Sequence, residues 1–143
     1  MNKLLYVFVC LLSVNAAIAA GGISEKILQI FKQSFPKAED VKWAEQPDKV
    51  TVDFKDGGIA TKVEYDLEGN FLSSVRFYSE KELPAKIQSK LRKKFPGETV
   101  FGVTEKTNEF GVEYDIKMED ATNWITVRAN GTGSMEVVEK FKK

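Results

Sequence analysis

The sequence predicts an α+β fold in which two tandem helix-plus-antiparallel-meander repeats form one twisted sheet with the helices on one face. The first observation is a repeat of about sixty residues, because Phe35-Pro36 ends one amphipathic segment and Phe95-Pro96 ends another. The second is that each segment is followed by runs of alternating apolar and polar residues. The third is that short turns separate these runs, which predicts antiparallel pairing.

Two helices are predicted, over residues 24–35 and 84–95. Ser24 is a suitable N-cap for the first, and Pro84 suits the first helical position of the second. Apolar residues at three- and four-residue steps give each helix one apolar stripe, which predicts packing against a sheet. The stripes consist of Ile27, Ile30, Phe31 and Phe35 in the first helix and of Leu83, Ile87, Leu91 and Phe95 in the second.

Each helix is followed by four predicted strands. Their ranges are 41–45, 49–55, 59–67 and 71–78 in the first repeat, and 99–106, 109–118, 123–129 and 134–141 in the second. Turn residues such as Asp56-Gly57-Gly58 and Asn130-Gly131-Thr132 separate them. Alternation predicts two apolar strand faces. They consist of Val50, Val52 and Phe54, and of Phe110, Val112, Tyr114 and Ile116.

Residues 1–20 have the pattern of a cleavable signal peptide. Lys3 precedes a short apolar run over residues 4–12, and Ala17-Ile18-Ala19 offers small residues for cleavage after Ala19 or Ala20. The run is shorter than the roughly 20 residues that a membrane span needs. No small residues precede Cys10 at a cleavage point, so lipidation is not expected.

The remaining residues, 21–143, are predicted to form a single domain made of repeats 23–80 and 81–143. Each repeat alone would be marginal in size, so we expect the two to share one sheet or one core. The predicted signal peptide implies an exported protein, periplasmic or secreted, with no membrane span in the mature chain.

Composition argues against catalysis and cofactor binding. The sequence has no histidine, and its single cysteine lies in the predicted signal peptide, so the usual general base, thiolate nucleophile and zinc ligands are missing. Asp53, Glu64 and Asp66 could project from one sheet face as paired carboxylates, although a solvated acidic strand face is the simpler interpretation. We therefore expect no enzyme, catalytic residue, cofactor or metal site.

Charge gives no sign of a nucleic-acid or membrane partner, because 21 basic residues balance 21 acidic ones. The second predicted helix is nonetheless basic, and no aromatic residue is interleaved there for stacking on bases. We interpret it as a solvated face, with a patch for an acidic partner as the alternative. Its basic residues are Lys86, Lys90, Arg92, Lys93 and Lys94.

Aromatic residues divide into a predicted core set and a predicted surface set. The core set is Trp43, Phe54, Tyr65 and Phe77. Strand parity predicts that Ile125 and Val127 face the helices while Trp124 and Arg128 face away. The same reasoning directs Val75 and Phe77 inward and Arg76 and Tyr78 outward. Because Trp, Tyr and Arg dominate interface energetics when they cluster, the predicted partner-binding residues are Trp124, Arg128, Arg76 and Tyr78.

Several motifs resemble the PepSY-like proteins of the β-lactamase-inhibitor-like (BLIP-like) fold, over residues 23–141. They are Phe35-Pro36, Val41 with Trp43, Tyr65-Asp66 with Gly69, and Leu83-Pro84. The resemblance implies an exported bacterial protein with a saddle-like sheet, helices on one face and an open face for another protein. The second repeat departs from the pattern, with Val103 in the place of Trp43 and Arg128 in the place of Asp66.

These observations predict an exported, non-enzymatic binding module that uses an open sheet face to bind a protein or peptide. The resemblance adds regulation or inhibition of an exported hydrolase as a refinement. A carrier of small apolar ligands is one alternative, and it predicts an enclosed cavity. A self-associating structural protein of the envelope is the other, and it predicts concentration-dependent oligomers.

Overall fold

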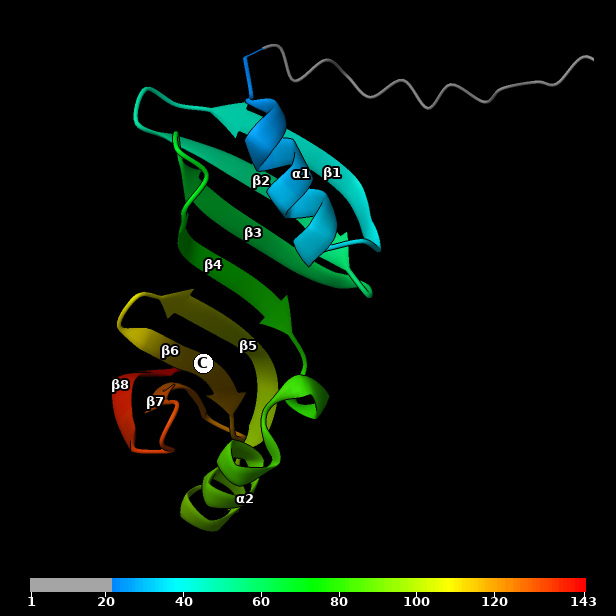
Figure 1. The fold of residues 1–143 in the computed structure, drawn as a ribbon. Coiled ribbons are helices and arrows are strands. Elements are labelled where there is room, and N and C mark those ends of the chain that lie inside the picture. The colour runs from blue at the N-terminus through cyan, green and yellow to red at the C-terminus, as the bar shows by residue number, and fades with distance from the viewer. Residues whose placement is uncertain (1–21) are drawn as a thin grey trace, which may run out of the picture.

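The computed structural model describes residues 22–143, and the predicted signal peptide and its cleavage point lie outside this range. Two helices each precede four strands (Figure 1). The elements are α1 (Glu25–Ser34), β1 (Ala38–Glu45), β2 (Lys49–Asp56), β3 (Ile59–Asp66), β4 (Phe71–Tyr78), the short 3₁₀ helix η1 (Glu80–Glu82), α2 (Ala85–Lys94), β5 (Thr99–Asn108), β6 (Gly111–Glu119), β7 (Asn123–Asn130) and β8 (Met135–Lys142).

All eight strands form one antiparallel sheet in the order β1 to β8. The sheet is continuous across the repeat boundary because β4 pairs with β5, from Ser73 opposite Asn108 to Tyr78 opposite Val103. The predicted α+β fold is therefore confirmed, with two helix-plus-meander units in a single open sheet (Figure 1).

Both helices cover the same face of this sheet, which we call the helix side. Residues opposite one another in an antiparallel pair share a face, and pairing connects Phe54, Thr61, Arg76, Glu105 and Tyr114 across β2 to β6. Phe54 belongs to the core beneath α1 and Tyr114 to the core beneath α2. The opposite face, which we call the open face, has neither helix on it.

Local chemistry explains where the helices begin. Ser24 caps α1, since its side chain accepts a hydrogen bond from the Ile27 backbone N–H. Pro84 is the N-cap of α2 rather than its first helical residue, because its carbonyl accepts the first N–H groups of the helix, from Ile87 and Gln88. Each helix ends at the phenylalanine before a proline, as the sequence predicts.

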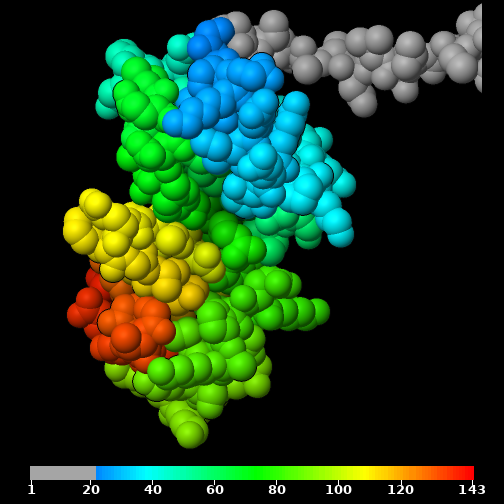
Figure 2. Space-filling view, viewed as in Figure 1, coloured from blue at the N-terminus to red at the C-terminus, as the bar shows by residue number. Residues whose placement is uncertain are grey.

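The sheet carries two hydrophobic cores, one under each helix. Figure 2 shows the corresponding units as two lobes along the sheet. The core under α1 contains Ile27, Phe31, Val50, Val52, Phe54, Val63 and Tyr65. The core under α2 contains Leu83, Ile87, Leu91, Val103, Tyr114, Ile116, Met118, Ile125, Val127 and Ala129. The repeats thus share a sheet but not a core.

Three of the four predicted core aromatics are confirmed. Phe54 and Tyr65 are buried, and Trp43 packs edge-on against Phe31 with ring centroids 5.1 Å apart. Phe77 is a wrong prediction, since 54% of its surface is exposed. It pairs with Ala60 and Thr104 on the open face, so the predicted parity of β4 is reversed.

The start of β6 also differs from the prediction. A two-residue turn joins Asn108 to Gly111, and Phe110 lies in this turn with 89% of its surface exposed. Gly111 has a φ of 127°, a conformation that favours glycine, which explains why the chain turns here. Tyr114 and Ile116 remain buried as predicted.

Candidate functional site

The open face combines ion pairs with exposed aromatic side chains. In the first unit, Lys49 pairs with Glu64 at 2.8 Å, and Lys62 pairs with Asp53 at 3.6 Å. Hydrogen bonding by Lys49 lowers the pKa of Glu64. Asp66 accepts hydrogen bonds from Asn70 in the β3–β4 turn. Asp53, Glu64 and Asp66 therefore each interact with a different neighbouring side chain rather than with one another, as expected for a solvated strand face.

A second ion-pair group spans β5 to β7. Arg128 Nε lies 2.8 Å from Asp115 Oδ1, and Lys106 Nζ lies 2.7 Å from Asp115 Oδ2. Arg128 also pairs with Glu113 at 3.2 Å. Hydrogen bonding by Arg128 lowers the pKa of Asp115. Burial acts in the opposite sense, but a further hydrogen bond from Lys106 keeps the pKa below its usual value. This network holds Arg128 in place across the strands.

Aromatic residues gather at the β8 end of the open face. Phe101, Trp124 and Phe141 surround a hollow of about 240 Å³ together with Lys117, and we call these four residues the aromatic cup. Phe101 stands edge-on to Trp124, with ring centroids 5.2 Å apart and an interplanar angle of 88°. The rings remain accessible, because 67% of Phe101 and 43% of Phe141 are exposed.

Positive charge borders the aromatic cup. Lys117 Nζ lies 5.8 Å from the Phe141 ring centroid, and Lys143 Nζ lies 5.1 Å from that of Trp124. Both distances are within the range of cation–π attraction. Lys143 is also paired with Glu119, whereas Lys117 makes no salt bridge with any residue in the range 22–143.

A β-bulge and a glycine lie in β5 beside the cup. The β5–β6 register shifts between Val100 and Gly102, so Phe101 is the extra residue of the bulge. Gly102 then lies opposite Lys117, and a Cβ added to Gly102 would meet nothing within 4 Å. Because Met118 and Val103 are buried on the helix side, the missing side chain of Gly102 would have pointed to the open face.

Two of the four predicted partner-binding residues lie on the open face. Trp124 lies opposite Phe141, and Arg128 lies opposite Asp115, while Ile125 and Val127 between them are buried. Their predicted parity is confirmed. Whether they bind a partner stays a prediction.

The other two, Arg76 and Tyr78, lie on the helix side, so their predicted orientation is wrong. Tyr78 packs against the core beneath α2 and donates a hydrogen bond to Glu105, which also pairs with Arg76 at 3.4 Å. The reason is that β4 runs between the two helix-covered cores. Ser74 and Arg76 lie on the uncovered strip of the helix side, and Val75 and Phe77 face the other way.

Sequence reasoning missed Phe77, Phe101, Lys117 and Phe141 as members of the open face. Phe77 was assigned to the core by its alternation with polar neighbours, which shows that two faces exist but not which one a helix covers. For the cup, the available signal is Phe101-Gly102, since a glycine inside a strand marks a bulge or a close approach.

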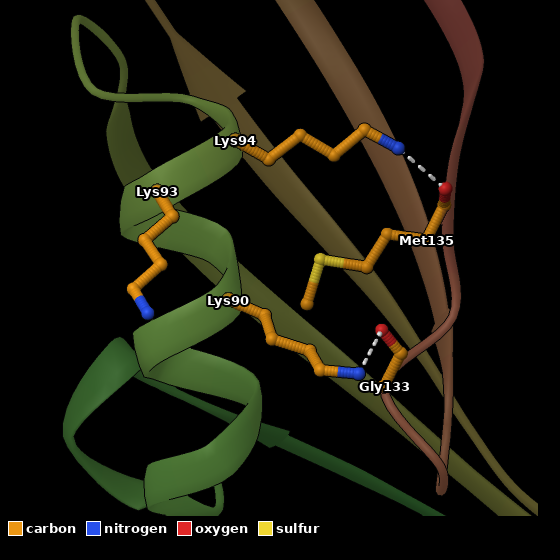
Figure 3. A pocket seen from close by; sticks show the side chains of 5 residues that line it. All are labelled: Lys90, Lys93, Lys94, Gly133 and Met135. Atoms are coloured by element: carbon orange, nitrogen blue, oxygen red, sulfur yellow. Dashed lines mark hydrogen bonds between the residues drawn. The ribbon is translucent and has the colours of Figure 1, made fainter.

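A separate hollow of about 320 Å³ lies between α2 and the segment that leads into β8 (Figure 3). Lys90 Nζ donates to the carbonyls of Thr132 and Gly133, and Lys94 Nζ donates to that of Met135. Part of the basic character of α2 thus serves to attach the helix to the β7–β8 turn. Within residues 22–143, no group of three or more His, Cys, Asp and Glu side chains is arranged to hold a metal ion.

The fold has close counterparts among solved structures. A BLIP-like protein from Bacteroides fragilis superposes with a TM-score of 0.61 at 18% identity, covering 83% of this chain and 85% of that one. A DUF2874 family protein from Bacteroides uniformis gives a TM-score of 0.59 at 18% identity, covering 83% and 88%. The same score, at 17% identity and the same coverage, is obtained for a structure from Bacteroides eggerthii described among "putative periplasmic proteins".

These comparisons confirm the predicted resemblance at the level of fold. No family model matches the sequence, and no curated protein matches it. The fold of this chain is thus similar to that of the BLIP-like protein, an α+β domain with one uncovered sheet face. In the described range 22–143, no helix is long and apolar enough to cross a membrane.

Proposed function

We propose that this protein is an exported, non-enzymatic binding module that presents its open face to another protein or a peptide. The observation that carries the proposal is that both helices lie on one side of the sheet while aromatic side chains are exposed on the other. Phe77, Phe101 and Phe141 are exposed by 54%, 67% and 43%. Exposed apolar surface bordered by charged residues is typical of protein interaction sites.

The composition of the open face supports a protein partner. Aromatic residues and arginine are enriched in interface centres, and Trp124 and Arg128 both lie on the open face. Ion pairs across β5 to β7 hold Arg128 in one geometry, which reduces the conformational entropy lost on binding. Export to the periplasm or beyond is supported by the signal-like N-terminal sequence and by the description of the Bacteroides eggerthii structure.

Inhibition or regulation of an exported hydrolase is a refinement of this proposal. It is supported by the likeness to the BLIP-like protein from Bacteroides fragilis. Adding the purified protein to peptidase and β-lactamase assays of the native envelope fraction tests it. Inhibition at stoichiometric concentration is the expected result, and unchanged activity of every assayed hydrolase would reject the refinement while leaving partner binding open.

Two phenylalanines on β4 provide a matched test of the open face. Phe77 is 54% exposed on the open face, and Phe71 is 47% exposed on the helix side, where it lies opposite the buried Tyr65. We expect Phe77→Ser to reduce capture of partner proteins from the native envelope fraction at least tenfold. Phe71→Ser is the control and should retain capture.

Circular dichroism and urea unfolding would establish that both variants are folded. Trp124→Ala provides an independent change at the other end of the open face. Equal capture by wild type, Phe77→Ser and Trp124→Ala would contradict the proposal. Loss of capture in Phe71→Ser alone would assign binding to the helix side instead.

A further inference from the structure

We infer that the aromatic cup is a recognition pocket for one bulky apolar side chain of a linear peptide segment that carries a carboxylate next to that residue. This inference rests on the proposed function and specifies the chemistry of the partner. The cup consists of Phe101, Lys117, Trp124 and Phe141.

The dimensions of the cup fit a side chain rather than a whole ligand. Its volume is about 240 Å³. Pockets for drug-sized ligands generally span about 300–1,000 Å³, whereas a cavity of roughly 150 Å³ already holds a benzene ring. One aromatic or large aliphatic side chain fills such a space, and the rest of the ligand must then lie on the surrounding sheet.

The construction of the cup also indicates a binding role. A glycine inside a strand weakens the strand and often marks a place where a ligand or another backbone approaches closely. Gly102 does not have a positive φ, and the space beside it is open, so the backbone itself does not require glycine there. The bulge at Phe101 places an aromatic ring at the rim of this space, where 67% of it is exposed.

Charge complementarity indicates which residue of the peptide lies next to its inserted apolar side chain. The nearby carboxylates have other partners, since Glu119 pairs with Lys143 and Glu139 accepts a hydrogen bond from the Thr126 hydroxyl. Lys117 makes no salt bridge within residues 22–143, although its ammonium lies 5.8 Å from the Phe141 ring centroid. A carboxylate beside the inserted side chain would pair with Lys117 at the rim.

Peptide display on the purified protein tests the inference. Random linear peptides are selected on wild type, and selected sequences are synthesised and titrated while the fluorescence of Trp124 is followed in a Trp43→Phe background. We expect the selected peptides to share a bulky apolar residue with Asp or Glu beside it. Replacing the apolar residue by alanine should weaken binding at least tenfold.

Gly102→Val adds a branched side chain opposite Lys117 on the open face without removing any residue of the cup, and it should weaken binding at least tenfold. Gly97→Val is the matched control, because Gly97 also lacks a positive φ and a Cβ there would also meet nothing within 4 Å. Lys117→Gln should weaken binding up to about fivefold, the range of an exposed ion pair. Replacing the peptide carboxylate by an amide should then cause no further loss in Lys117→Gln.

Three results would overturn the inference: no enriched peptide, enriched peptides without the acidic-apolar pair, or equal binding by wild type and Gly102→Val. These results are distinguishable from failure of the proposed function. If Phe77→Ser abolishes partner capture while Gly102→Val does not, the open face binds through another part of its surface. If neither change affects capture, the open face itself is not the binding surface.

Discussion

At the scale of single residues, Asp115 shows how the open face is held together. Its carboxylate lies on β6 and accepts hydrogen bonds from Arg128 on β7 and Lys106 on β5. The pair with Arg128 is bidentate, with distances of 2.8 Å and 3.2 Å, and such geometry is stronger than a single contact. One carboxylate thus connects three strands and orients the arginine that we propose as a binding residue.

We predict that Asp115 contributes to stability above about pH 4 and not at strong acidity. Its pKa is lowered in the folded protein, chiefly by hydrogen bonding from Arg128. The contribution is therefore present above the unfolded pKa of about 3.9 and is lost as the pH falls through the folded pKa. Asp115→Asn should lower the free energy of unfolding at pH 7 and flatten its decline in acid.

Urea unfolding between pH 7 and pH 2 measures this effect. Asp48→Asn, in the exposed turn before β2, is a suitable control and should behave as wild type. Parallel acid profiles for wild type and Asp115→Asn would show that the ion pairs do not contribute.

At the scale of elements, the pairing of β4 with β5 is the feature that joins the two units. On the helix side of this seam, Arg76 and Tyr78 both contact Glu105, and the Arg76 guanidinium lies 5.5 Å from the Tyr78 ring centroid. No core residue of either unit comes from β4, so this polar cluster occupies the strip between the two cores. Arg76 and Tyr78, two of the four predicted partner-binding residues, thus contact Glu105 of the other repeat across this seam.

Tyr78→Phe tests the seam. Loss of the hydrogen bond to Glu105 should reduce the free energy of unfolding at pH 7 by ~1.5 kcal/mol, as is typical of a bond to a charged group. Burial, and then Glu105, raise the pKa of Tyr78. The wild type should therefore lose stability as the pH rises above the unfolded tyrosine pKa of about 10, and Tyr78→Phe should lose less.

Chemical denaturation at pH 7 and at pH 10 to 12 gives both quantities. Glu105→Gln in combination with Tyr78→Phe completes a double-mutant cycle, in which the contact predicts non-additive losses. Strictly additive losses would mean that the hydrogen bond does not contribute to stability.

At the scale of the whole molecule, one sheet supports two separate cores. Ile27 in one core and Ile116 in the other are 1% and 0% exposed, and they belong to different buried clusters. We predict that Ile27→Val and Ile116→Val each lower the free energy of unfolding by about 1 kcal/mol. In the double variant the two losses should add to within about 0.5 kcal/mol. Global urea unfolding of the single and double variants measures this.

A pair within one core provides the comparison. Ile116 and Val127 lie opposite each other on β6 and β7 and are both fully buried. Ile116→Val and Val127→Ala share one packing environment, so their costs should not add. Coupling between Ile27 and Ile116 as strong as that between Ile116 and Val127 would indicate a common core.

Much of the fold was predictable because it follows from local chemistry. The stripes of Ile27 and Phe31 and of Ile87 and Leu91 have helical spacing, and all four residues are buried. The glycine-containing turns gave antiparallel neighbours in order, so the meander followed from the length of the connections. The repeat itself implied a sheet shared by both units.

The candidate site was predictable only in part. Trp124 and Arg128 could be placed because their neighbours Ile125 and Val127 match buried positions of the first repeat. The members of the aromatic cup could not be placed in this way. A bulge changes which face a residue reaches, and Phe141 comes close to Phe101 only because β5 to β8 pair in one sheet. Phe110 was misplaced because the turn lies two residues later than the turn signals suggested.

The sequence by itself determined the elements, their order and the presence of two faces on every strand, because these depend on spacing and on turn residues close together in the chain. Only the tertiary structure decided which face of β4 lies on the helix side. This depends on how far the two helices extend over the sheet, and neither core contains a residue of β4. The polar seam between the cores and the outward direction of Phe77 are both consequences of that arrangement.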